Sequence, residues 1–474
     1  MVLCLPLSSG ALTLDEATAR FRVVNQLARE MNDRPLVESV GKAGRSAERF
    51  INSGENAKAD ALLCELEAKV GIDPGGWAMA GLPIFRPTHE TEAAMKTLSA
   101  KLNEAMRSGD AAVVTDVCRE LMKALGTQAG TPDARRKGDR AEPRKISEAG
   151  ATRLFIDALE SEGKSMRAIM AARPLPDQMM RTYGYAVSAL CEAHPLIAKH
   201  VPENLADAER VIRGGCKIMI DLQQPEGHFP FPDLRGKNIR FGAMAEKHLQ
   251  DEGGKVVSGW LVTPDPAGGS QFDTGLCGSA LLQAGRLLRE DSWTKAGLRA
   301  ADWAAGQPGA SNFNYNAFSI TLLAQAFVTT NEIKYLDAAL IKWRVGVAPG
   351  QAANGRWADP HNARTVYHHI IVRAMNDLLE SLPVERAAER EEIRSALAKA
   401  MQPMLAEFEA LGITVHCLRE LVRYRDLTHS ADPTLIKAID DSVSVMLAKC
   451  KRGDRARMGV PPGEFPWLAK TANP

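Results

Sequence analysis

The sequence lacks any long hydrophobic run, and it lacks an excess of charge of either sign. No apolar stretch approaches the ~18 residues that a membrane-spanning helix needs, so we expect no membrane partner. Lys and Arg number 59 and Asp and Glu number 58, which gives a formal net charge of +1. This balance argues against a protein held on nucleic acid by its overall charge, so we expect no nucleic-acid partner either.

Paired cysteines are also absent. No two of the eight cysteines form a Cys-x-x-Cys pair, which excludes a zinc knuckle and a thioredoxin-like redox motif. Most of them stand among Leu, Ala and Val in segments with helical periodicity, and we interpret these as small buried hydrophobic residues. The eight are Cys4, Cys64, Cys118, Cys191, Cys216, Cys277, Cys417 and Cys450.

The N-terminus, Met1 to Ala11, is apolar and then rich in small residues, without a basic segment. A truncated signal peptide would have this pattern, and it would indicate a periplasmic or extracellular protein. The frayed terminus of a cytoplasmic protein would have it as well. The sequence leaves both interpretations open.

The 474 residues are enough for two to four domains. Residues 1–130 predict a small N-terminal helical region. Residues 131–146 are basic and nearly free of apolar side chains, which is typical of an exposed linker. Residues 147–474 then carry a long series of amphipathic patterns and predict the main domain.

These patterns predict an all-α fold. Apolar residues recur at helical spacing, and no stretch alternates convincingly as a strand. In the N-terminal region we expect helices within 14–70 and a pair over 89–126 that is broken at Ser108-Gly109-Asp110. In the main domain we expect helices at 147–171, 176–194, 203–222, 273–289, 291–305, 315–329, 332–346, 361–381, 385–411, 414–426 and 432–451.

A weak repeat links successive helix pairs. Each pair ends in a Gly-containing turn followed by an aromatic residue, and the spacing becomes similar if 235–270 is an insertion. A helix pair of this kind cannot bury its apolar face alone, so neighbouring pairs are expected to stack. The turns are Gln224–Pro230, Gly306–Tyr315, Gly350–Pro360 and Val460–Trp467.

The segment Gln223–Gly236 (QQPEGHFPFPDLRG) resembles the Q-x-P-x-G-G-W-P turn of helical pectate lyases, which are α/α-toroid enzymes. The resemblance implies an α/α toroid, a ring of helix pairs, acting on a carbohydrate. His228 and Phe229 stand where those lyases have Gly and Trp, and their downstream acidic stretch is missing. We therefore predict no cofactor, and dependence on a divalent cation such as calcium stays open.

In a toroid, the turns that enter the inner helices line one mouth, and here those turns collect polar and aromatic residues. We expect catalytic roles for His361, Tyr315 and Asp273. His361 would sit in the first turn of its helix, where the dipole keeps imidazole neutral and able to act as a base. Asp273 would also cap its own helix. For substrate binding we expect Asn314, Arg240, Arg364, His228, Asp233, Trp357 and His368.

Three functions compete. The favoured one is a lyase that cleaves a uronic-acid-containing oligo- or polysaccharide by β-elimination, with His361 as base, Tyr315 as acid and Asn314 as neutraliser of the substrate carboxylate. The second is a glycoside hydrolase that uses carboxylates such as Asp273. The third is a non-catalytic helical scaffold that binds a partner in its concave face.

Overall fold

The computed structural model describes residues 34–70, 89–125, 144–174, 178–235, 253–257, 259–262, 268–357, 365–411, 417–451 and 461–471. It also describes residues 21, 24–25, 28, 245–246 and 249–250. The predicted linker 131–146 lies outside these residues apart from its last three positions. Residues Met1 to Ala11 lie outside them entirely.

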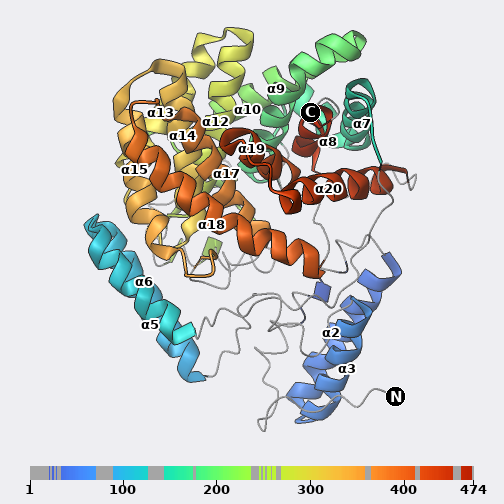
Figure 1. Ribbon diagram of the computed structural model, residues 1–474, viewed down its shortest axis with the longest axis vertical. Helices are drawn as coiled ribbons and strands as arrows, with labels where there is room; N and C mark the ends of the chain where they lie inside the picture. The colour runs from blue at the N-terminus through green and yellow to red at the C-terminus, as the bar shows by residue number, and fades with distance from the viewer. Residues whose placement is uncertain are drawn as a thin grey trace.

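Two helical hairpins precede the main domain (Figure 1). The first, α2 (Arg34–Asn52) and α3 (Asn56–Lys69), forms apolar clusters of its own around Val40 and Leu63. The second, α5 (His89–Ser108) and α6 (Ala111–Leu125), turns at Gly109 (φ +72°), where the sequence predicts a break. This second hairpin shares the core of the main domain, and α6 contacts α15 and η2 there.

Helices dominate the main domain, which confirms the all-α prediction at that level. Its elements are α7 (Glu148–Ser161), α8 (Gly163–Met170), α9 (Met180–His200), η1 (Pro202–Asn204), α10 (Leu205–Leu222), α12 (Ser270–Leu288), α13 (Asp291–Gly306), α14 (Phe313–Thr330), α15 (Ile333–Gly346), η2 (Ala348–Gly350), α17 (Thr365–Ser381), α18 (Ala387–Leu411), α19 (Leu418–Thr428), α20 (Pro433–Lys451), η4 (Pro462–Glu464) and α21 (Phe465–Lys470).

Alternate helices are neighbours in space. We call α9, α12, α14, α17 and α19 the inner helices, because each packs against the next one in this order. The helix that follows each of them, α10, α13, α15, α18 and α20, packs back onto it. At the end of the chain, α21 packs against α7, α9 and α19 (Figure 1).

Contacts between inner helices run in step along their lengths. Arg181 meets Asp273 near the starts of α9 and α12, and Ser188 meets Gln283 further along both. The same holds for α12 with α14, and for α17 with α19. These neighbours are therefore parallel, and their N-termini lie on the same side of the domain.

One turn motif recurs with the same contacts. Gln223 donates its side-chain amide to the carbonyls of Gly227 and Ala296, both at 2.9 Å. Gln351 repeats this with Gly355 at 3.2 Å and Ala396 at 2.9 Å.

The glycine of each motif is required by its backbone. Gly227 (φ +109°) and Gly355 (φ +83°) lie in the left-handed region. An added Cβ would meet the carbonyl oxygen of Arg299 at 2.3 Å in the first case and that of Lys399 at 2.0 Å in the second. Each turn therefore packs directly against a helix of the next pair. The glutamine that corresponds to Gln351 is Gln223, whereas the sequence predicts Gln224.

A small sheet forms between residues just before the expected insertion 235–270 and residues within it, and the sequence predicts none of its strands. Strands β1 (Phe231–Pro232), β3 (Trp260–Val262) and β2 (Lys255–Val257) pair antiparallel in the order β1-β3-β2, with Phe231 opposite Leu261. Strands of two or three residues are too short to show alternation in a sequence. Trp260 and Leu261 are buried, so the sheet closes part of the core.

Other expectations can be compared directly. Four cysteines, Cys118, Cys216, Cys277 and Cys417, are buried as predicted. Cys4 lies outside the described residues, and the remaining three are half-buried. Among the described helices, none combines the length and apolar character needed to cross a membrane.

Candidate functional site

The inner helices carry polar residues on the faces that they turn toward one another. On α9 these are Arg181, Tyr185, Ser188 and Glu192, whose spacing of four, three and four residues marks one helix face. All four side chains reach solvent, although α9 is packed against α10 and α12 on its other sides. This pattern shows that solvent reaches the polar face of α9, and we call the region between this face and the facing side chains of α12, α14, α17 and α19 the inner space.

At the N-terminal end of this space, Arg181 and Asp273 form a bidentate ion pair. The guanidinium donates to the two carboxylate oxygens at 2.9 and 2.6 Å, and the Arg181 backbone amide donates to Asp273 Oδ1 at 3.0 Å. Asp273 thus caps the start of α9 from a neighbouring helix. Burial acts to lower the pKa of Arg181, but the charge and hydrogen bond of Asp273, with smaller effects of Tyr185 and Tyr315, together hold it above its usual value. The guanidinium also lies 3.8 Å from the centre of the Phe272 ring.

Tyr185 stands in the middle of the inner face. Its side chain is 41% exposed, yet the surrounding protein raises its pKa above the usual 10.0 by desolvation. Together these facts describe a phenol that touches water inside an enclosure. The positive charges of Arg373 and Arg181 partly offset the rise in pKa. The phenol is therefore protonated at neutral pH, and within the described chain its hydroxyl makes no hydrogen bond.

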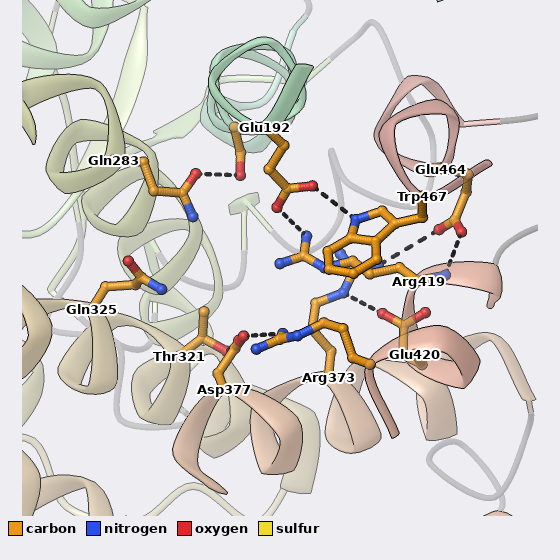
Figure 2. A network of polar contacts seen from close by, with 12 residues as sticks. Glu192, Gln283, Thr321, Gln325, Arg373, Asp377, Arg419, Glu420, Glu464 and Trp467 are labelled. Carbon is orange, nitrogen blue, oxygen red and sulfur yellow. Dashed lines mark hydrogen bonds and ion pairs between the residues drawn. The ribbon is translucent and has the colours of Figure 1, made fainter. Parts of the chain in front are cut away.

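A second charged cluster lies on α17, α19 and η4 (Figure 2), and the charges of its Arg373 and Glu420 act on Tyr185. Arg373 donates to Glu420 Oε1 at 2.6 Å, and its guanidinium lies 3.8 Å from Glu464 Oε1. Desolvation acts to raise the pKa of Glu420, but the charges of Arg373, His369 and Arg419 outweigh it, so the pKa is lowered. Burial and the neighbouring Glu420 charge raise the pKa of Glu464 to about 8. One carboxyl of this pair is therefore ionised and the other is neutral near pH 7.

The far half of the space, beyond Tyr185 along α9 and beyond Arg373 along α17, holds further polar contacts. Glu192 accepts from Arg419 at 2.8 Å and from the Trp467 indole at 3.1 Å. Asp377 is bound by Arg423, and it accepts from the Thr321 hydroxyl at 2.8 Å. Figure 2 shows these side chains converging from α9, α12, α14, α17, α19 and α21.

Two glutamine side chains at this space have their amide oxygens bonded but not their amide nitrogens. Gln283 accepts from Ser188 at 2.7 Å and Gln325 accepts from Arg286 at 2.6 Å, so both amide oxygens are engaged. In the described part of the chain, neither amide nitrogen has an acceptor. In Figure 2 both side chains extend toward the same space. Together with the Tyr185 hydroxyl they offer donors to a ligand rich in acceptor oxygens.

Two of the sequence-predicted residues come together. Asp273 is buried beside Arg181, and Tyr315 is half-buried on the next inner helix, with its ring stacked on Phe272 at 6.3 Å. Tyr315 also contributes to the raised pKa of Arg181. Asp273, Tyr315 and Arg181 therefore lie together at the N-terminal end of the space. The expectation that Asp273 caps its own helix is wrong, because α12 begins three residues earlier, at Ser270.

Five other predicted residues lie away from this space or are buried beside it. His228 stacks on Trp303 of α13, Asp233 pairs with Arg235, and Asn314 is buried. Trp357 and His368 contact each other and are fully buried.

The buried His368 is held by α18. Its Nε2 bonds the Ala400 carbonyl at 2.8 Å, and burial with the Arg356 charge lowers its pKa to about 3. Its neighbour His369 is also buried, and its charge helps to lower the pKa of Glu420.

The remaining predicted residues, His361, Arg364 and Arg240, lie outside the described residues. No group of three or more His, Cys, Asp or Glu side chains suited to a metal ion occurs in the described part of the chain. The possible need for a divalent cation stays a question for experiment.

Sequence reasoning missed most of the inner face. Tyr185, Gln283 and Arg373 lie in the middle of helices, whereas the residues predicted from the sequence stand in or near turns. The only sign of them in the sequence is a set of polar residues at helical spacing. Such a set is typical of an ordinary solvent-facing helix surface unless the neighbours of that surface are known.

In comparisons with known proteins, no protein-family model and no curated protein matches the chain.

Proposed function

We propose that the chain is an α/α-toroid enzyme that binds a uronic-acid-containing glycan among its inner helices and cleaves it by β-elimination. The toroid is supported by the order of contacts, in which each inner helix meets the next and is backed by the helix that follows it. The packing of α21 against α7 and α9 supports closure of the ring, because it joins the two ends of the series.

The observation that carries the function is the Tyr185 hydroxyl, which is exposed inside an enclosure between two guanidinium–carboxylate pairs. β-Elimination requires a group that neutralises the substrate carboxylate, a base for the proton on the adjacent carbon and an acid for the leaving oxygen. Arg181 and Arg373 are both partly exposed, and each guanidinium has further N–H donors besides those that bind Asp273 and Glu420, which can bind the substrate carboxylate. Tyr185 is protonated at neutral pH and suits the acid.

We assign the base to His369. It lies one turn before Arg373 on the same face of α17, and it is close enough to Glu420 for their charges to interact. In the proposed reaction, the free-base form of His369 takes the proton on the carbon next to the carboxylate. That electron pair forms the carbon–carbon double bond, the bond to the leaving oxygen breaks, and Tyr185 protonates that oxygen. The histidinium then returns its proton to the phenolate through water.

Hydrolysis has weaker support. A glycosidase needs two accessible carboxyl groups, whereas Asp273 and Glu420 are buried and each is bound by an arginine. A scaffold without activity has no need of an unpaired phenol inside an enclosure. Both functions are distinct outcomes of the assay below.

The test is turnover of a panel of acidic polysaccharides, followed both by ultraviolet absorbance of the unsaturated product and by new reducing ends. We expect both signals to rise together, and Tyr185→Phe to lower the rate by roughly 10²–10⁴. Tyr424→Phe is the matched control, because Tyr424 belongs to the same set of helices but interacts with Asp432 near α20. Reducing ends without absorbance would identify a hydrolase. The absence of both signals would favour a scaffold. Full activity of Tyr185→Phe would refute the assignment of the acid.

A further inference from the structure

One guanidinium in the far half of the inner space has only neutral partners. Arg286 of α12 donates to the Gln325 carbonyl at 3.3 Å, to the Gln325 amide oxygen at 2.6 Å and to the Thr329 hydroxyl. In the described part of the chain, no carboxylate forms an ion pair with it. Arg181 and Arg373 differ in this respect, because each of them binds a carboxylate.

The surrounding protein desolvates the Arg286 charge without compensating it. Desolvation lowers the pKa of this guanidinium, and among the described residues only the Cys191 thiol acts on it in the opposite direction. Burial raises the pKa of Cys191, so the thiol is neutral at pH 7 and supplies no negative charge. The Arg286 side chain is nevertheless exposed to solvent. A cation that is partly desolvated but accessible gains from an anion that a ligand brings to it.

Amide donors stand beside this guanidinium. Gln283 lies three residues before Arg286, which places both side chains on one face of α12. The Gln283 amide oxygen accepts from Ser188 at 2.7 Å. The Gln325 amide oxygen accepts from Arg286, which has only donors, so the Gln325 nitrogen is the atom turned away. Both glutamine side chains extend toward the inner space, where their nitrogens have no acceptor among the described residues (Figure 2).

We infer that Arg286, Gln283 and Gln325 form an oxyanion site in the far half of the inner space. Its ligand is a carboxylate or sulfate group, because a negatively charged acceptor satisfies the guanidinium and both amides at once. Along α12, Arg286 lies about 20 Å beyond Asp273, the partner of Arg181, and this length spans several sugar residues. The site therefore takes a second acidic group of the same glycan, an assignment that rests on the proposed function.

The first experiment measures the binding of inorganic sulfate by calorimetry, with chloride used to keep the ionic strength constant. We expect saturable binding, which Arg286→Gln weakens by at least about tenfold through the loss of charge-assisted hydrogen bonds. Arg394→Gln is the matched control, because it removes the same charge from an exposed pair with Glu391 on α18, and it should bind sulfate as the unchanged protein does. Absence of saturable binding, or equal binding by Arg286→Gln, would overturn the oxyanion site.

The second experiment compares tetragalacturonic acid with its fully methyl-esterified form, which keeps the sugars and removes their charges. Binding is measured in the Tyr185→Phe background, so that neither probe is consumed. We expect Arg286→Gln to weaken binding of the acid by at least about tenfold and to leave the ester unchanged. Arg286→Lys keeps the charge and should lose less. Equal effects on both probes, or no effect on either, would refute a role for the site in binding the glycan.

Turnover decides the proposed function separately. A lyase whose binding of the acid does not depend on Arg286 would keep the function and lose the glycan's second contact. Binding that depends on Arg286 and on the charge of the probe, without turnover on any polymer, would keep the site and lose the function.

Discussion

Glu464 makes the stability of the domain depend on pH in a direction that is unusual for a carboxyl group. Its side chain faces Glu420 and Arg373, and its Oε2 accepts from the Arg419 backbone amide at 3.0 Å at the start of α19. Burial and the Glu420 charge raise its pKa to about 8, whereas the ordinary value is 4.5. Between pH 4.5 and about 8, the folded state therefore keeps a proton on Glu464 that the unfolded chain has already released.

The magnitude follows from proton linkage. Where the folded state binds one more proton than the unfolded state, the free energy of unfolding falls by about 1.4 kcal/mol per pH unit. With a folded pKa of about 8, the loss between pH 6 and pH 8 is about 2 kcal/mol. Glu420 adds nothing in this window because it is already ionised, and the two arginines stay charged throughout.

Glu464→Gln keeps an oxygen that can accept from the Arg419 amide but cannot ionise. We expect the variant to be the more stable protein already at pH 6, by about 2 kcal/mol, and this advantage to widen by about 2 kcal/mol more at pH 8. Urea unfolding followed by tryptophan fluorescence at pH 6, 7 and 8 measures this difference. Parallel pH profiles for the two proteins, or a variant that is less stable at pH 8, would show that Glu464 is ionised in the folded state.

Two further predictions concern stability. Asp273→Asn should lower the free energy of unfolding by about 2–3 kcal/mol, because it leaves Arg181 without its counter-ion, while Asp302→Asn at an exposed pair with Lys334 should change it by less than about 0.5 kcal/mol. Equal losses in urea denaturation would contradict the importance of burial. Gly227→Ala should cost more than about 2 kcal/mol, because the new Cβ meets a backbone carbonyl at a positive φ, whereas Gly306→Ala at the end of α13 meets nothing and should stabilise slightly. Thermal unfolding of the two variants checks the opposite signs.

The helices could be predicted from sequence because their packing demands a regular apolar period. The expected segments 291–305 and 432–451 agree within a residue or so with α13 and α20. Where a start was misjudged, a local cue competed with packing: an aspartate at the fourth position of α12 resembles a cap, yet its carboxylate belongs to the start of α9. Capping from another helix leaves no mark in the local sequence.

The site was less predictable for a related reason. Tyr315 and Asp273 stand near turns, where polar residues attract notice, and both do lie beside Arg181. A polar residue in mid-helix, such as Gln283, is normally explained by water on the outside of a domain. Which stripe of a helix faces inward depends on contacts with distant segments, and these contacts are formed by apolar residues that resemble any other core.

The link between Glu192 and Trp467 spans 275 positions along the chain. During synthesis, α9 leaves the ribosome long before the residues that complete its surroundings, so its inward face is first exposed to water without Arg419, Glu464 or the indole. Contacts of such large sequence separation form late and slowly. The interior thus acquires its final polarity only when the closing segment arrives, and a nascent chain that pauses before Glu464 would leave the Arg419 backbone amide and Glu192 Oε2 without their hydrogen-bond partners.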